Sequence, residues 1–214
     1  MHKIFYALAG VAAVAMAPAA NAAVTINFNG GTGGLSAGET SFATFSPGST
    51  GGVVVSPTVV IQSGSNGIGA DPAVGSMGDP YLSVLNGGST SFTFAGLTSL
   101  GLDFGSADSF NSFIVSLADG TSQTFTGEDV VAVGSADGDQ SSVRTNGRLT
   151  FNALTGPAIT GLTLTSGGNS LEIDNIGIVG GAVPEPATWG MMLLGFGAVG
   201  VSLRNRKRRV LQAA

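Results

Sequence analysis

Acid–base or nucleophilic chemistry in residues 24–183 would have to rest on carboxylates. This segment holds twelve of the thirteen acids and two arginines, but no His, no Cys and no Lys. Ser–His–Asp and Cys–His nucleophiles, zinc sites built on His or Cys, and Schiff-base lysines are therefore excluded from it. A glycosidase needs only two carboxylates, but no pair stands out by its spacing, and most acids adjoin Gly or Ser, as turn formers do. We expect no enzyme, and a carboxylate glycosidase is the least favoured alternative.

Calcium is the metal ion that these carboxylates suit best. Asp137-Gly138-Asp139, followed by Ser141 and Ser142, places two carboxylates within one turn, and Ca²⁺ prefers carboxylate and carbonyl oxygens on flexible loops. Glu128-Asp129 and Asp174 are further candidate ligands. A solvated acidic hairpin loop also explains Asp137 and Asp139, and we favour that interpretation over a calcium site. No other cofactor is expected.

Tight carbohydrate recognition by ring stacking is excluded by the aromatic composition. Sugar platforms are usually built from exposed Trp and Tyr, and residues 24–183 contain no Trp and only Tyr81. Most of the phenylalanines of the segment fall at the inward phase of strands and are expected in the core. The ten phenylalanines are Phe28, Phe42, Phe45, Phe92, Phe94, Phe104, Phe110, Phe113, Phe125 and Phe151. The Asp174-Asn175 pair resembles strand-end pairs of carbohydrate-binding modules, so weak polar recognition of a polymer by loops stays open.

These residues lie on a chain in which apolar and polar side chains alternate, the pattern of half-buried strands. Phe113, Val115 and Leu117 show this alternation. Asp119-Gly120 predicts a two-residue hairpin turn, and a phase slip at Asp174-Asn175 predicts a bulge. The predicted strands are 24–28, 53–60, 81–85, 90–95, 99–104, 112–118, 121–126, 129–133, 148–152 and 159–179, the last as two strands.

The fold class expected from this pattern is all-β, an antiparallel two-sheet sandwich of jelly-roll type. No stretch of residues 23–183 shows helical periodicity over three turns, so a second sheet has to cover the first. Residues 23–183 are expected to form one exported domain, since a segment of this length can bury a core. Residues 29–80 are its loop-rich part, dense in Gly, Ser and Thr, with one strand run that Pro57 interrupts.

Charge is distributed unevenly along the chain. Residues 24–183 carry twelve acids against Arg144 and Arg148, a net charge of −10, whereas the whole chain carries −5. A domain this acidic does not neutralise phosphates, which excludes nucleic-acid binding.

Residues 1–22 have the order of a secretory signal peptide. A short basic start precedes an apolar stretch over 4–17, and Pro18 precedes a small-residue site formed by Ala20 and Ala22. Cleavage is expected after Ala22, which predicts that the rest of the chain is exported. An uncleaved membrane anchor is the alternative interpretation.

The other end of the chain combines three features in a fixed order. Pro184-Glu185-Pro186 is followed by residues 187–203, which carry no charge, and then by a basic cluster over 204–209. The cluster consists of Arg204, Arg206, Lys207, Arg208 and Arg209, and residues 210–214 form a short tail. Seventeen helical residues rise about 26 Å, which suits a transmembrane helix. Basic residues stay on the cytoplasmic side, so the domain is expected to face outward, in agreement with the signal peptide.

Residues 183–197, VPEPATWGMMLLGFG, with the basic end that follows, resemble the PEP-CTERM sorting signal of Gram-negative bacteria in its PEPxxW variant. The resemblance implies that Pro184, Glu185 and Pro186 are recognised by exosortase, an integral-membrane processing enzyme, with Trp189 as a companion aromatic residue. It also implies that the tail is removed and the exported domain is released or transferred. Many members of the family are associated with exopolysaccharide and biofilm formation.

The expected protein is a non-catalytic protein of the cell surface or extracellular matrix. It is exported through the inner membrane, anchored there until exosortase processes it, and then found at the surface or outside the cell. Its expected partners are the exosortase, the inner membrane before processing and an exopolysaccharide. The alternatives are a calcium-dependent carbohydrate-binding module acting in the same matrix and the secreted glycosidase.

Overall fold

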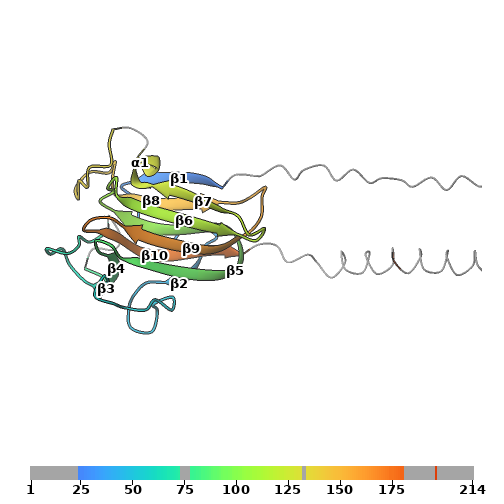
Figure 1. The fold of residues 1–214 in the computed structure, drawn as a ribbon, viewed down its shortest axis with the longest axis horizontal. Helices are drawn as coiled ribbons and strands as arrows, with labels where there is room; N and C mark the ends of the chain where they lie inside the picture. Colours follow the sequence, from blue (N-terminus) through green and yellow to red (C-terminus); the bar gives the residue numbers. More distant parts are fainter. Residues whose placement is uncertain (1–23, 73–77, 132–133, 181–195, 197–214) are drawn as a thin grey trace, which may run out of the picture.

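The computed structural model describes residues 24–72, 78–131, 134–180 and 196, and strands dominate it (Figure 1). All pairs between its strands are antiparallel, which confirms the predicted all-β class. The strands are β1 (Thr25–Gly30), β2 (Thr40–Ala43), β3 (Val59–Gln62), β4 (Tyr81–Val84), β5 (Ser89–Gly105), β6 (Asn111–Leu117), β7 (Ser122–Thr126), β8 (Gly147–Asn152), β9 (Ile159–Ser166) and β10 (Leu171–Gly180). A one-turn helix, α1 (Gly127–Val130), follows β7.

The long strand β5 belongs to two branches of one sheet. Its first part, Ser89 to Leu97, pairs with β9, which pairs in turn with β6, and β6 with β7. Its second part, from Ser99 onward, lies between β8 and β10. The second branch continues from β8 to β1, and from β10 to β2, β4 and β3. The described strands thus form one ten-stranded sheet, where two separate sheets were expected.

The two branches meet where β5 bends. Gly96 has φ of +111°, a conformation that glycine adopts without the steric penalty of a side chain, and the register with β9 shifts between Thr93 and Leu97. Backbone pairing continues through this bend. The strands predicted at 90–95 and 99–104 are therefore a single strand, because a glycine kink replaces the expected turn. The jelly-roll connectivity stays a prediction.

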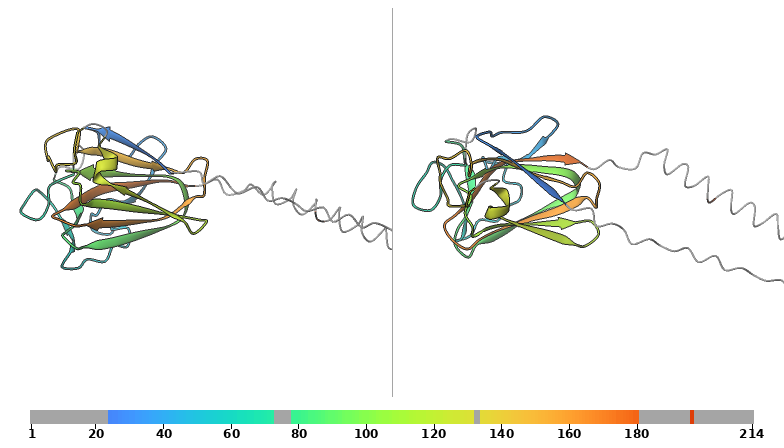
Figure 2. Two further views of the ribbon diagram at one scale, coloured as in Figure 1. Left: turned by 45° about the horizontal axis from the view of Figure 1, so that its top comes forward. Right: turned by 90° about the horizontal axis from the view of Figure 1, so that it is seen from above.

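The sheet curls so that its two branches face each other, and the hydrophobic core lies between them (Figure 2). Phe113 of β6 contacts Phe104 of β5 and Phe151 of β8, with ring centroids 5.0 and 5.8 Å apart. β6 is hydrogen-bonded to neither of these strands, so the contacts join opposite walls. The predicted core phenylalanines are buried at Phe45, Phe92, Phe94, Phe104, Phe113 and Phe151, and partly buried at Phe28, Phe42 and Phe125. Phe110 differs, because 36% of it is exposed.

Three predicted segments differ from the structure. The run 53–60 is a strand only from Val59, because Pro57 lies in a turn before it and Val54 is exposed. The strand predicted at 129–133 is wrong in its described part, which begins in α1. The Asp129 carboxylate accepts hydrogen bonds from the Thr126 N–H and hydroxyl, both at 2.7 Å, and so stabilises a helical turn there. β2 lies inside the segment that was expected to be loops.

A turn lies at the predicted place but is longer than the predicted two residues, since Leu117 donates its N–H to the Thr121 carbonyl at 2.9 Å; the predicted bulge is present. Gly120 has φ of +84° in the connection between β6 and β7, and the Asp119 carboxylate accepts the Thr121 N–H at 2.9 Å. Asn175 has φ of +47°, and the pairing of β10 with β5 shifts between Asp174 and Gly177. The extra residue re-aims the end of β10, as bulges do.

The described domain begins and ends at the same end of the sheet. Thr25 pairs with Asn152, Asn152 with Ser99, and Ser99 with Val179, so the start of β1 and the end of β10 share one row across four strands. Within the described ranges, no helix is long and apolar enough to cross a membrane. The predicted signal peptide at 1–22 and the predicted span at 187–203 lie outside those ranges, apart from Phe196.

Candidate functional site

The outer face of β1 and β8 is polar because both strands alternate strictly. Ile26 and Phe28 of β1 and Leu149 and Phe151 of β8 point to the core. Since successive strand residues face opposite sides, the residues between them face outward. Their register places Asn27 opposite Thr150, Asn29 opposite Arg148 and Thr25 opposite Asn152. The result is an outer face with side-chain amides and hydroxyls on two neighbouring strands.

A pocket of about 360 Å³ lies on this face. Its floor comes from β1 and β8, and its roof from the loop that follows β1. The lining residues share small or polar side chains, with one aliphatic exception: Asn27, Asn29, Thr32, Gly33, Gly34, Leu35, Ser36, Arg148, Thr150 and Asn152. No carboxylate is among them, so the pocket has hydrogen-bonding groups but no acid to transfer a proton.

Arg148 ties the roof of the pocket to its floor. Its guanidinium forms buried ion pairs with Glu39 and with Asp103, whose Oδ1 lies 3.0 Å from Nη1. Nη1 also donates to the Asn175 carbonyl at 2.6 Å. Asp103 Oδ2 in turn accepts the Gly34 N–H at 2.8 Å. One side chain of β8 therefore holds β5, β10 and the roof loop together.

The ion network of Arg148, Glu39 and Asp103 occupies space that is free because two neighbouring strand residues are glycines. A Cβ at Gly101 of β5 would collide with Glu39 Oε1, and a Cβ at Gly177 of β10 would lie 2.6 Å from Glu39 Oε2 and 2.8 Å from Arg148 Nη2. Real Cβ atoms do not approach other atoms this closely. The absence of side chains at these two positions is what allows Glu39 and Arg148 to lie flat against the sheet.

Another buried acid, Glu172 of β10, lies under the segment that contains Ala70. Its carboxylate accepts hydrogen bonds from the Ala70 N–H at 3.2 Å, from the Ser106 hydroxyl at 3.1 Å and from the Ser170 hydroxyl. Burial raises the pKa of Glu172, and the three hydrogen bonds partly oppose this rise. Burial, with Glu172 next in importance, raises the pKa of the Tyr81 hydroxyl to about 12. Neither group lines the pocket.

Asp108 is a partly buried carboxyl whose pKa is raised toward neutral pH. Burial, followed by the charge of Asp137, raises its pKa from 3.8 to about 6. Asp108 lies after β5 and forms an isolated bridge with Asp137. Asp108 does not line the pocket. Its raised pKa therefore does not provide an acid that could act on a ligand bound there.

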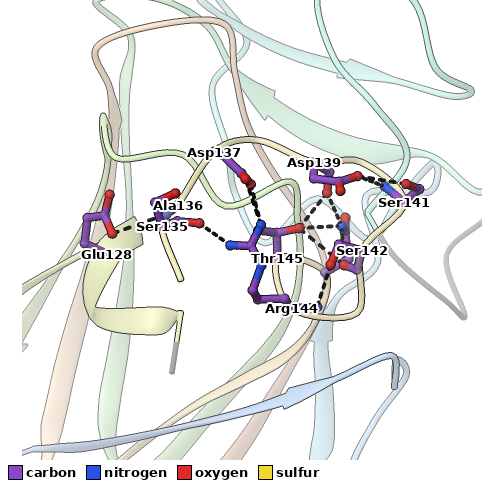
Figure 3. A network of polar contacts seen from close by, with 10 residues as sticks. Glu128, Ser135, Ala136, Asp137, Asp139, Ser141, Ser142, Arg144 and Thr145 are labelled. Atoms are coloured by element: carbon purple, nitrogen blue, oxygen red, sulfur yellow. Dashed lines mark hydrogen bonds and ion pairs between the residues drawn. The ribbon is translucent and has the colours of Figure 1, made fainter. Parts of the chain in front are cut away.

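The predicted calcium residues lie in the loop over 134–146, where they have protein partners (Figure 3). The two oxygens of Asp137 each lie 2.8 Å from Arg144 Nη2. Asp139 Oδ1 accepts the Ser141 N–H at 2.9 Å and its hydroxyl at 2.8 Å. These contacts lower the pKa of both carboxyls. A guanidinium next to Asp137 competes with any cation there.

The other candidate ligands lie on other elements. Glu128 lies in α1 and accepts the Ala136 N–H at 3.2 Å, whereas Asp129 caps the same turn. Asp174 is buried on β10, opposite Asp103 in the register with β5. No group of three or more His, Cys, Asp or Glu that could hold a metal occurs among the residues with a described placement. Calcium stays a prediction.

The predicted sorting and cleavage residues lie outside the described ranges. These are Ala20, Ala22, Pro184, Glu185, Pro186, Trp189 and the basic cluster at 204–209. Their sequence nevertheless has a recognisable match. Residues 182–208 match the family described as the PEP-CTERM protein-sorting motif.

The chain carries a PEP-CTERM sorting motif. The matched residues include Pro184-Glu185-Pro186, Trp189 and nearly all of the basic cluster, as the sequence predicted. The PEP-CTERM motif implies an exported protein that is processed by exosortase, a membrane enzyme. No curated protein matches the chain.

Sequence reasoning missed the pocket, although a signal for it was present. The strand sequences TINFN and RLTFN both alternate between apolar and polar residues. Phe28 and Phe151 were predicted as core residues, whereas no role was assigned to the polar residues Asn27, Asn29, Thr150 and Asn152. Only the pairing of β1 with β8 brings them together, and that pairing joins segments more than a hundred residues apart in the sequence.

Proposed function

We propose that this protein is a non-catalytic component of the surface or extracellular matrix of a Gram-negative bacterium, delivered there through its PEP-CTERM tail. The observation that carries the proposal is the sorting motif at residues 182–208, at the opposite end of the chain from a signal-peptide pattern. The two signals define export followed by membrane-associated processing. The domain between them is then the part that works outside the cell, in association with exopolysaccharide.

The absence of catalysis is supported by the chemistry of the exported segment. Residues 24–183 contain no His, Cys or Lys, and the pocket on β1 and β8 has no carboxylate in its lining. A glycosidase would need two carboxylates on either side of a bound sugar. Glu39 and Asp103 accept backbone N–H groups from the pocket-lining residues Ser36 and Gly34. Both acids also form ion pairs with Arg148. They serve the structure of the roof loop.

The proposal is tested by replacing Pro184-Glu185-Pro186 with three alanines in the full chain. Pro184, Glu185 and Pro186 lie within the matched sorting motif and are the element that exosortase is expected to recognise, so the variant is expected to stay in the membrane fraction with its tail intact. The control is Thr188→Ala, which changes the same tail between the Pro-Glu-Pro element and Trp189 and should be processed normally. Cell fractionation with an antibody against the domain measures both. Normal processing and release of the triple-alanine variant would refute the proposed sorting.

A calcium-dependent carbohydrate-binding module is the alternative function for the same exported domain. Its carbohydrate part agrees with the polar pocket. Its calcium part is weakened by the Arg144 guanidinium, which lies against Asp137. The two parts are separated by measuring carbohydrate binding with and without EDTA.

A further inference from the structure

We propose that the pocket between β1, β8 and the loop over 31–36 binds a neutral saccharide unit. The binding groups are the side-chain amides of Asn27 and Asn29, the hydroxyl of Thr150 and the side chain of Asn152. No metal ion takes part. This inference adds a ligand site to the proposed surface role. It rests on the proposed function only in that the saccharide would be encountered outside the cell.

The lining suits a ligand with many hydroxyl groups. An asparagine side chain presents both an acceptor and two donors, and a threonine hydroxyl presents both in one atom. A sugar hydroxyl also donates and accepts, so such groups can pair with it in either sense. Pockets for drug-like molecules are mostly apolar, whereas Leu35 is the one aliphatic side chain in this lining. With 45% of its surface exposed, Leu35 can cover the C–H face of a sugar ring.

The charges around the pocket favour a neutral ligand over an acidic one. Arg148 is the one charged residue in the lining, and its guanidinium is already bound to Glu39 and Asp103. It therefore has little positive charge to offer to a uronic acid or a sulfate group. Residues 24–183 carry a net charge of −10, which repels a polyanion.

The pocket is held open by contacts that do not need the ligand. Gly34 donates its N–H to Asp103 at 2.8 Å, and Ser36 donates its N–H to Glu39 at 2.7 Å. Both acceptors belong to the buried network of Arg148, so the roof loop is fixed to the sheet. Binding to a site that is already formed costs less conformational entropy.

Arg148, which lines the pocket, keeps one buried donor, Nε, without an acceptor among the described residues. Buried donors without acceptors are rare.

The test measures binding of the full chain, purified in detergent, to immobilised polysaccharides. Neutral dextran, mannan, galactan and cello-oligosaccharides are compared with acidic alginate and polygalacturonate, and the best neutral probe is then titrated by calorimetry. We expect one or more neutral probes to bind, the acidic probes to bind more weakly, and EDTA to have no effect. Failure of every neutral probe, preference for the acidic probes, or loss of binding in EDTA would overturn the proposal.

A pair of variants assigns the binding to this pocket. Asn27→Ala with Thr150→Val removes polar groups from a cross-strand pair that is at least partly exposed, so the fold should persist, and affinity is expected to fall roughly tenfold or more. The control is Ser91→Ala with Thr163→Val, another exposed cross-strand pair, on β5 and β9. It should bind as the native chain does. Equal affinity of the first variant and the native chain would overturn the assignment.

The sorting proposal and the binding proposal fail separately. Loss of saccharide binding by the purified chain leaves the localisation result untouched, because the tail variants are scored in cells without any added ligand. Conversely, normal localisation of the triple-alanine variant would refute the sorting proposal and leave the affinity of the pocket as measured.

Discussion

Arg148 links the stability of the domain to the shape of its pocket. Its guanidinium is buried together with the carboxylates of Glu39 and Asp103, and those two acids accept the backbone N–H groups of the roof loop. Loss of one partner from a buried charge network leaves the others uncompensated. A change at this residue is therefore expected to affect folding and the loop together.

Arg148→Met is expected to lower the free energy of unfolding by about 3–5 kcal/mol, because Glu39 and Asp103 remain buried without their cation. The matched control is Arg144→Met, which breaks the more exposed pair with Asp137 and should lower the free energy of unfolding much less, because solvent screens that pair. Denaturant unfolding of the full chain measures both values. Similar losses in the two variants would contradict the role given to Arg148.

Asp108 is expected to make the domain less stable as the pH rises. Burial raises its pKa in the folded chain from 3.8 to about 6, so the fold favours the protonated form. The stability gained from it is complete below the unfolded pKa and is lost as the pH rises through the folded value. Glu172, whose pKa is also raised by burial, contributes in the same direction.

Asp108→Asn should therefore flatten the decrease of Tm between about pH 4 and pH 6. Asp119→Asn is the control, since hydrogen bonds from Thr121 lower the pKa of Asp119 and its contribution is lost only as the pH falls below the usual aspartate range. Thermal unfolding across a pH series gives the slopes. An unchanged slope in Asp108→Asn, equal to that of the native chain, would refute the assignment.

Among the elements, β5 and β10 carry glycines because the ion network lies on their outer face. Gly101 and Gly177 stand next to each other in the register of the two strands, and a Cβ at either position would meet Glu39. Glycine normally weakens a strand. Here it makes room for the carboxylate that holds the roof loop.

Gly101→Ala is expected to destabilise the domain by about 1–3 kcal/mol, the usual cost of forcing an extra methyl group into a packed site. Gly67→Ala is the control, because a Cβ there meets nothing within 4 Å, and surface changes of that kind stay within roughly 0.5 kcal/mol. Chemical denaturation compares the two. A Gly101→Ala variant as stable as the control would show that the network does not fill this space.

Strands with one buried face could be predicted from the sequence, because that burial produces alternating apolar and polar residues. Alternation located β6 and β7, and the Asp119-Gly120 turn joined them. The same alternation gives no pairing partners, so it could not show that Asn27 faces Thr150. It also could not separate a kinked strand from two strands at Gly96. The short strand β2 was missed because its neighbours are rich in Gly, Ser and Thr.

The site was less predictable than the fold for the same reason. Asp137 and Asp139 drew attention because they are close in sequence, but their carboxylates bind Arg144 and Ser141. Glu39, Asp103 and Arg148 come from distant segments and meet only in the folded domain. Local motifs such as Pro184-Glu185-Pro186 are readable without a fold, and that motif was matched.

At the scale of the whole molecule, the first and last strands of the described domain begin and end at the same end of the sheet. β1 begins and β10 ends in the same row of the sheet, with the signal-peptide pattern before β1 and the sorting motif at 182–208 after β10. The polar pocket lies on the outer face of β1 and β8.

Export of the chain, followed by processing at its PEP-CTERM tail, can be tested directly in cells. Intact mass spectrometry of the protein recovered from cells with and without a functional exosortase tests it most directly. With the enzyme, the protein is expected to lack both residues 1–22 and the basic cluster at 204–209; without it, the tail should be retained. An identical mass in the two strains, with the basic cluster present in both, would contradict the account.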